Sequence, residues 1–109
     1  MRPSITEKEV CQLIRQDSLD HTESYQLSTY AIFLMLIGKV LQKEESGNNE
    51  NPESDKVVKA ELGPYRASGA HTILKLAETC DNIAIGKLVD SEHRLDAINV
   101  LRYIDQHII

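Results

Sequence analysis

The chain has 109 residues and a net charge of −5, with 41% hydrophobic and 27% charged side chains, a mixture typical of one globular domain. These proportions exclude a disordered chain, and a single Phe without any Trp predicts a mainly aliphatic core. Five of the seventeen acids lie in one segment, residues 44–55, so the rest of the chain is close to neutral. A neutral body lacks the strongly basic surface of many nucleic-acid-binding proteins.

The first predicted helix begins at a capping box. Thr6 stands where an N-cap residue would accept a backbone hydrogen bond, and Glu9 follows three positions later. Val10 and Leu13 come next at helical spacing. This pattern predicts a helix over about 7–17 with one apolar side.

The second predicted helix is the longest, over about 21–43, and Asp20 and Glu23 form a capping box at its start. Residues 31–37 are all apolar, which predicts a helix buried on all sides at the centre of the fold. Gly38 would let another helix approach closely, although a glycine is also tolerated in a helix at a cost of about 1 kcal/mol. The apolar run is shorter than the ~20 residues that span a bilayer, so we expect no membrane contact.

A polar segment at about 44–55 is predicted to form an acidic, mobile loop, because it has no apolar side chain to anchor it. One interpretation is a solubilising linker, and the other is an electrostatic contact that speeds the capture of a basic partner protein. Tyrosine rings also suit protein contacts. The candidate partner-binding residues are therefore Glu44, Glu45, Glu50, Glu53, Asp55, Tyr65 and Tyr103.

Two short segments after the acidic loop have more than one interpretation. A helix over about 52–62 fits a proline at its start and a Gly-Pro stop signal after it, with a strand over 56–62 as the alternative. Residues 83–89 are apolar, but the segment is too short for periodicity to distinguish a helix from a strand.

A helix over about 69–80 is also predicted, with Ser68 as its cap and the polar pair 81–82 as its end. The sequence over 76–83 has a weak resemblance to a helix-turn-helix motif, so a homodimeric DNA-binding regulator is one alternative function. The segment that follows carries only one base, Lys87, where a recognition helix needs several polar or basic side chains. Nucleic-acid binding is therefore less well supported than a protein partner.

The last helix is predicted over about 92–107, starting at Asp90 or Ser91. Its apolar face consists of Ala97, Leu101, Ile104 and Ile108, widened by Leu95 and Ile98. An apolar chain end of this kind is expected to dock on the core or on a second subunit. The candidate homodimer interface is Ile104, Ile108 and Ile109.

The sequence contains no residue pattern of a known catalytic or metal site. Its four histidines and two cysteines have none of the spacings of metal ligands, so neither a metal nor a cofactor is expected. Cys11 and Cys80 suit core positions, and Cys80 falls near a helix C-terminus, which does not stabilise a thiolate. Without a signal pattern or a C-x-x-C motif, we expect free thiols and a cytoplasmic protein.

The predicted fold is all-α, a compact bundle of about five helices around a central apolar helix, with residues 1–109 in a single domain. We interpret the chain as a small non-enzymatic protein–protein interaction module, such as an inhibitor, an immunity protein or a regulatory adaptor. The alternatives are the DNA-binding regulator and an enzyme whose site is assembled from residues scattered along the chain.

Overall fold

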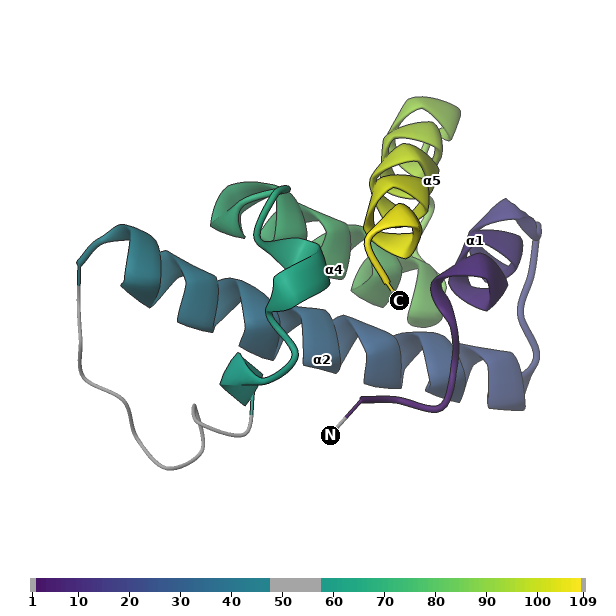
Figure 1. The fold of residues 1–109 in the computed structure, drawn as a ribbon. Coiled ribbons are helices and arrows are strands. Elements are labelled where there is room, and N and C mark those ends of the chain that lie inside the picture. Colours follow the sequence, from purple (N-terminus) through teal and green to yellow (C-terminus); the bar gives the residue numbers. More distant parts are fainter. Residues whose placement is uncertain (1, 48–57, 109) are drawn as a thin grey trace.

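Residues 2–47 and 58–108 are described by the computed structural model, and within them the fold is a bundle of four α-helices and one short 3-10 helix (Figure 1). The elements are α1 (Glu7–Arg15), α2 (His21–Glu45), η1 (Gly63–Tyr65), α4 (Ala70–Ala84) and α5 (Ser91–Gln106). The predicted all-α class is confirmed, and these ranges contain no β-strand. Four α-helices lie wholly within the same ranges, against an expected total of about five.

The short helix predicted over 52–62 lies mostly outside the described residues. In its described part, Val58 and Lys59 are helical and the chain then turns toward η1. The alternative strand over 56–62 is therefore wrong from residue 58 onward. Val58 and Leu62 are buried, so this short segment contributes to the core.

α2 runs along the length of the molecule, and α1, α4 and α5 all lie on one side of it (Figure 1). Its 25 residues correspond to about 37 Å at 1.5 Å per residue, close to the longest dimension of the fold, 41 Å. The most extensive helix pairs are α2 with α4 and α1 with α5, whereas α4 and α5 contact each other less. The core therefore lies between α2 and the three helices above it.

One face of α2 is exposed, contrary to the expectation that this helix is buried on all sides. Tyr25 is 74% exposed, Ile32 56% and Leu36 41%, while Leu34 and Ile37 are fully buried. An apolar sequence does not determine how many neighbours a helix receives, and here they come from one side. Among the described helices, α2 is also long and apolar enough to cross a membrane, although half of its apolar window is buried inside the fold, as in many core helices.

Gly38 lies at the contact between α2 and α4. A Cβ atom at Gly38 would be 2.6 Å from Leu74 Cδ2 and 2.7 Å from Leu74 Cγ, distances that real Cβ atoms essentially never show. Leu74 thus occupies the space that a side chain at this position would need. The predicted close helix approach at Gly38 is confirmed.

Three predicted helix starts are confirmed by their capping hydrogen bonds. The side-chain oxygens of Thr6, Asp20 and Asp90 each accept the backbone N–H three residues further on, at 3.2, 2.8 and 2.8 Å. The first two caps are complete capping boxes, and each cap of this kind contributes about 1 kcal/mol. These starts are local features, which is why the sequence predicts them.

The start of α4 differs from the prediction, because its N-cap is Gly69 and not Ser68. Gly69 has φ of +84°, a left-handed conformation that a glycine adopts without strain, and it supplies no side-chain cap. Instead, the backbone N–H of Ala70 donates to Glu45 Oε2 at 2.9 Å. The last residue of α2 therefore caps the first turn of α4.

The end of α4 also corrects the prediction. The helix continues through the polar pair 81–82 to Ala84, because Ile83 is buried and packs the last turn against the core. Residues 85–90 then form an irregular connection, where a helix or a strand over 83–89 was expected. Since no helix follows a break at 81–82, the resemblance to a helix-turn-helix motif over 76–83 is not realised.

The start of α5 is anchored by Arg94, whose side chain is hydrogen-bonded within the fold. The guanidinium donates to the carbonyl oxygens of Val89 at 3.0 Å and Gln16 at 3.4 Å, and also to that of Ile14. These hydrogen bonds connect the end of α1 to the start of α5. Leu95, predicted to widen the apolar face of α5, is instead 58% exposed.

Cys11 and Cys80 are buried free thiols inside the core, as the sequence predicted. Burial raises the pKa of Cys80 to about 12 and also raises the pKa of Cys11. Both side chains therefore remain protonated near neutral pH, the form that is a poor nucleophile and a poor metal ligand.

Candidate functional site

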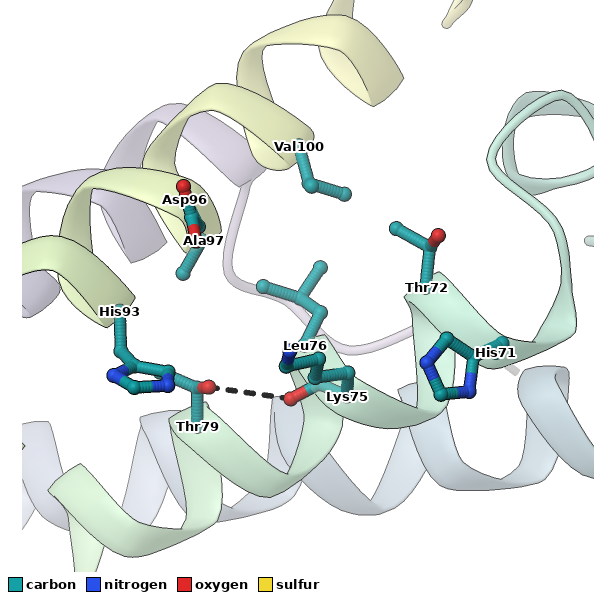
Figure 2. Close-up of a pocket in the computed structure, with 9 residues that line it drawn as sticks. All are labelled: His71, Thr72, Lys75, Leu76, Thr79, His93, Asp96, Ala97 and Val100. Carbon is teal, nitrogen blue, oxygen red and sulfur yellow. Dashed lines mark hydrogen bonds between the residues drawn. The ribbon is translucent and has the colours of Figure 1, made fainter.

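A groove between α4 and α5 is one of several surface hollows in the described part of the chain, with a volume of about 270 Å³ (Figure 2). It exists because α4 packs mainly on α2 and α5 mainly on α1, so that the facing sides of α4 and α5 meet only in part. The α4 wall consists of His71, Thr72, Lys75, Leu76 and Thr79, and the α5 wall of His93, Asp96, Ala97 and Val100.

The groove has an apolar floor. Figure 2 shows Leu76 pointing from α4 into the space between the helices, with Val100 facing it from α5. Leu76 and Ala97 are buried, and Val100 is half-buried. Thr72 stands next to Leu76 and offers its methyl group to the same space (Figure 2). Binding of a ligand in this groove would therefore be driven mainly by the burial of apolar surface.

Polar side chains form the rim, and several of them are already engaged within the chain. Thr79 Oγ1 donates to the carbonyl oxygen of Lys75 at 3.2 Å (Figure 2). His93 Nδ1 lies 2.6 Å from Asp90 Oδ1, and the backbone N–H of His93 holds the pKa of Asp90 below its usual value. Lys75 and Asp96, both exposed, make no ion pair within the described residues, so the rim offers one charge of each sign.

A second hollow continues the groove toward the connection between the helices. It shares Lys75, Thr79 and His93 with the first and is also lined by Leu88. Leu88 is fully exposed, which leaves a large apolar side chain in water. The two hollows and Leu88 together make one continuous contact surface, called the α4–α5 groove below.

Tyr103 extends the α5 wall of this groove. Asp96, Val100, Tyr103 and His107 follow one another at spacings of four, three and four, which places them on one face of α5. Tyr103 is 44% exposed, and its ring lies against the His107 ring with centroids 4.5 Å apart. Of the predicted partner-binding residues that the structure describes, Tyr103 is the one that lies on the groove face.

Tyr65 was predicted to bind a partner, but the structure buries it completely. Its hydroxyl accepts a hydrogen bond from Arg2 Nη1 at 2.7 Å and donates to Glu7 Oε2 at 3.2 Å. The ring also packs edge-on against Phe33, with centroids 5.8 Å apart. No surface of Tyr65 is left for a partner, so this prediction is corrected.

The acidic residues of the predicted loop fall into two groups. Glu44 and Glu45 belong to α2, so the helix extends two residues beyond its expected end. Glu44 Oε1 pairs with Arg66 Nη1 at 3.1 Å, and Glu45 caps α4. Glu50, Glu53 and Asp55 lie outside the described residues. Glu45 therefore has a structural role that the charge pattern did not reveal.

The described residues of the candidate homodimer interface pack against the core of their own chain. Ile104 is fully buried, and Ile108 is half-buried and packs against the core. Ile109 lies outside the described residues. Because Ile104 has no exposed surface, it cannot contact a second subunit, and this part of the prediction is corrected.

A buried polar cluster was not foreseen from the sequence. Glu7 is 1% exposed, and its carboxylate accepts hydrogen bonds from Tyr30 Oη at 2.8 Å, from Tyr65 Oη at 3.2 Å and from the Arg2 guanidinium. Every buried polar side-chain atom in the described ranges has a partner. The cluster ties together segments up to 63 positions apart, so no local pattern could have indicated it. It joins the N-terminal segment and α1 to α2 and η1.

The Glu7 cluster predicts a loss of stability at high pH. Burial raises the pKa of Tyr65 to about 12 and raises that of Tyr30 well above its usual value of 10. The two tyrosines contribute fully to the free energy of unfolding below pH 10, where their hydroxyls are protonated in both the folded and the unfolded chain. Above pH 10 this contribution decreases, because the hydroxyls ionise in the unfolded chain before they ionise in the folded one. We expect the free energy of unfolding to fall between pH 10 and 12, with a Tyr65 contribution of about 2 kcal/mol.

Urea unfolding at fixed pH values from 8 to 12 would measure this loss. The matched control is Tyr65→Phe, which lacks the titrating hydroxyl and should lose correspondingly less stability over the same interval. NMR signals of the Tyr65 ring report its ionisation directly. A native Tyr65 that titrates near pH 10 would contradict the prediction.

The described residues contain no group of three or more His, Cys, Asp or Glu side chains that could hold a metal ion. In comparisons with protein families, curated proteins and solved structures, the chain shows no match. The class defined by the structure is thus an all-α helical bundle with an apolar groove between two helices.

Proposed function

We propose that this chain is a non-catalytic protein-binding module of the inhibitor, immunity-protein or adaptor type, and that it binds its partner in the α4–α5 groove. The observation that carries the proposal is an apolar floor with an exposed rim of both charges, continued by Leu88 and Tyr103. Protein interfaces combine these features, because a central apolar contact is surrounded by polar groups that set the register.

The size of the groove supports a protein partner. Small-molecule sites are usually clefts of ~300–1,000 Å³ that enclose most of the ligand. Each of the two hollows of this groove, at about 270 and 280 Å³, is smaller than such a cleft and is open to solvent. The groove suits one or two apolar side chains projecting from a partner, with Lys75 and Asp96 pairing with charges beside them.

The hydrogen bonds at the rim support binding in preference to catalysis. An activated nucleophile needs a base within about 3.2 Å that is free to take its proton. The Thr79 hydroxyl donates to the backbone carbonyl of Lys75, so its proton is directed away from His93, whose Nδ1 is paired with Asp90. These contacts order the rim and leave the apolar floor as the principal feature of the groove.

Filling the groove should abolish partner binding. Thr72→Trp places an indole over Leu76, in the space that the partner's apolar side chain would need, and we expect at least a tenfold weaker complex. The matched control is Gln12→Trp, which adds the same indole at an exposed position of α1 outside this groove.

The test begins with affinity purification from cells of the source organism after nuclease treatment. Calorimetry follows with the purified protein that co-elutes in stoichiometric amount. Binding retained by Gln12→Trp and lost by Thr72→Trp would support the proposal. Equal binding by the two variants, or recovery of nucleic acid with no protein, would overturn it.

A further inference from the structure

The buried cluster around Glu7 has the form of a receptor for a guanidinium group. Arg2 Nη1 donates to Tyr65 Oη at 2.7 Å, and Nη2 of the same group donates to Glu7 Oε1. The two acceptors match the fork of one planar guanidinium, which the compact charge of an ammonium does not reproduce. The hydroxyls of Tyr30 and Tyr65 donate to the other carboxylate oxygen and orient it. Glu7, Tyr30 and Tyr65 are called the guanidinium site below.

The guanidinium site belongs to the core of the fold, whereas its occupant belongs to a peripheral segment. The three residues of the site are at most 1% exposed, while the Arg2 side chain is 30% exposed. Figure 1 shows the N-terminal segment crossing α2 as an extended stretch before α1 begins. Residues 2–5 make no backbone–backbone hydrogen bond within the described residues. Side chains, chiefly Arg2 and the buried Ile5, therefore hold this segment in place.

A carboxylate buried in this way favours any cation that reaches it. Removing one partner of a buried ion pair leaves an uncompensated charge, which costs far more than the loss of an exposed pair. The attraction between the partners is also stronger where water is largely excluded than at the surface. When Arg2 leaves, the guanidinium site is therefore ready to accept another guanidinium.

A hollow beside Arg2 gives a ligand access to the guanidinium site. It has a volume of about 170 Å³, and Arg2, Pro3 and Phe33 are among the residues that line it. The Phe33 ring also packs against the rings of Tyr30 and Tyr65, with centroids 6.2 and 5.8 Å apart. The hollow and the site are thus contiguous, so an incoming arginine can place its apolar stem in the hollow and its guanidinium on the carboxylate.

We propose that the guanidinium site binds an arginine side chain of another protein chain, and that Arg2 is the competing ligand from the same chain. Arg2 is five positions from Glu7, so its local concentration at the site is in the millimolar range, as for other short flexible links. An external arginine binds when Arg2 is displaced, and its apparent Kd rises as the fraction of vacant sites falls. The N-terminal segment therefore controls how readily an external arginine is captured.

This site goes beyond the proposed function. It is formed by α1, α2 and η1, which supply Glu7, Tyr30 and Tyr65 respectively. None of these residues lines the α4–α5 groove, so the groove remains accessible when the guanidinium site is occupied. The two sites can thus be tested independently.

Arg2→Ala vacates the guanidinium site and should open it to an external ligand. The probe is N-acetyl-arginine amide, titrated at constant ionic strength while NMR follows the ring signals of Tyr30 and Tyr65. We expect Arg2→Ala to bind this probe about tenfold more tightly than the wild type does. N-acetyl-lysine amide should bind about fivefold more weakly, because it lacks the fork. Arg15→Ala is the matched control, since Arg15 is exposed on α1 and makes no ion pair within the described residues.

Two further variants separate binding from folding, which circular dichroism checks for each protein. Arg2→Lys keeps a positive charge beside Glu7, so it provides the test if Arg2→Ala does not fold. Its ammonium competes less well than the native guanidinium, and the arginine probe should bind it about threefold more tightly than the wild type. Arg2→Ala combined with Glu7→Gln removes the carboxylate and should bind neither probe.

Two further measurements identify the source of the arginine. Sedimentation equilibrium of the wild type at about 1 mM would show a dimer, lost in Arg2→Ala, if a second copy supplies its own N-terminal segment. A wild-type monomer would assign the arginine to a different protein. Methylguanidinium lacks the stem of the side chain and should bind Arg2→Ala more weakly than the arginine probe. Equally tight binding of methylguanidinium would overturn the assignment to a protein side chain.

Three other results would overturn the proposal. The first is a folded Arg2→Ala chain that binds the arginine probe no more tightly than Arg15→Ala does. The second is binding that persists when Glu7→Gln is added to Arg2→Ala. The third is equal affinity for the arginine and lysine probes, which would show that the site does not distinguish a guanidinium from other cations.

Discussion

Replacing Glu7 with alanine should lower the free energy of unfolding by about 3–5 kcal/mol. The substitution removes the common acceptor of Tyr30, Tyr65 and Arg2. Two tyrosine hydroxyls would then be buried with one partner or none, and each unsatisfied buried group costs about 1–3 kcal/mol. The N-terminal segment would also lose the contact that holds Arg2.

Urea unfolding followed by circular dichroism measures this effect, and Glu9→Ala is the control on the same helix. Glu9 is an exposed member of the capping box, so its removal should cost only about 1 kcal/mol. Glu7→Gln preserves the shape and one acceptor oxygen and should fall between the two. If Glu7→Ala cost no more than Glu9→Ala, the structural importance of the cluster would be contradicted.

Introducing a valine at Gly38 should destabilise the fold by about 2–4 kcal/mol. Its Cβ would overlap Leu74 Cγ and Cδ2, and overpacking of a helix contact typically costs about 1–3 kcal/mol before the additional methyl groups are counted. Gly38→Ala should have a smaller net effect, because the same overlap is partly offset by about 1 kcal/mol of helix propensity.

A double-mutant cycle identifies the cause of this loss. In a Leu74→Ala background the space beside Gly38 is vacant, so Gly38→Ala should become neutral or stabilising. Gly63→Ala is the control, because a Cβ there meets no atom within 4 Å and its φ is not positive. Strictly additive effects of Gly38→Ala and Leu74→Ala would show that the two positions do not clash.

Features set by neighbouring residues were the ones that the sequence predicted well. Capping at Thr6, Asp20 and Asp90 depends on residues three positions apart, and each was confirmed. The end of α4 was missed, because burial of Ile83 against other helices outweighs the local tendency of a polar pair to break a helix. Tertiary packing routinely overrides such propensities.

The candidate site depended on contacts between distant residues, and it was predicted only in part. Tyr103 is exposed on the groove face, as an amphipathic ring on a surface helix can be. Tyr65 has the same side chain but is buried, with its hydroxyl bonded to a carboxylate 58 positions away, which composition and spacing do not show. The groove itself arises because α4 and α5 each have another principal neighbour, a property of the assembled fold.

The hydrogen bond from Ala70 to Glu45 joins the end of α2 directly to the start of α4, although 25 positions separate the two residues. This contact, together with the packing of Leu74 on Gly38, fixes how the two helices lie, whatever the length of the chain between them. Closing a longer loop costs little, about 0.6 kcal/mol for each doubling of its length. Changes in the length of that connection are therefore inexpensive, whereas its sequence is constrained at Val58, Leu62 and Tyr65, which are buried in the core.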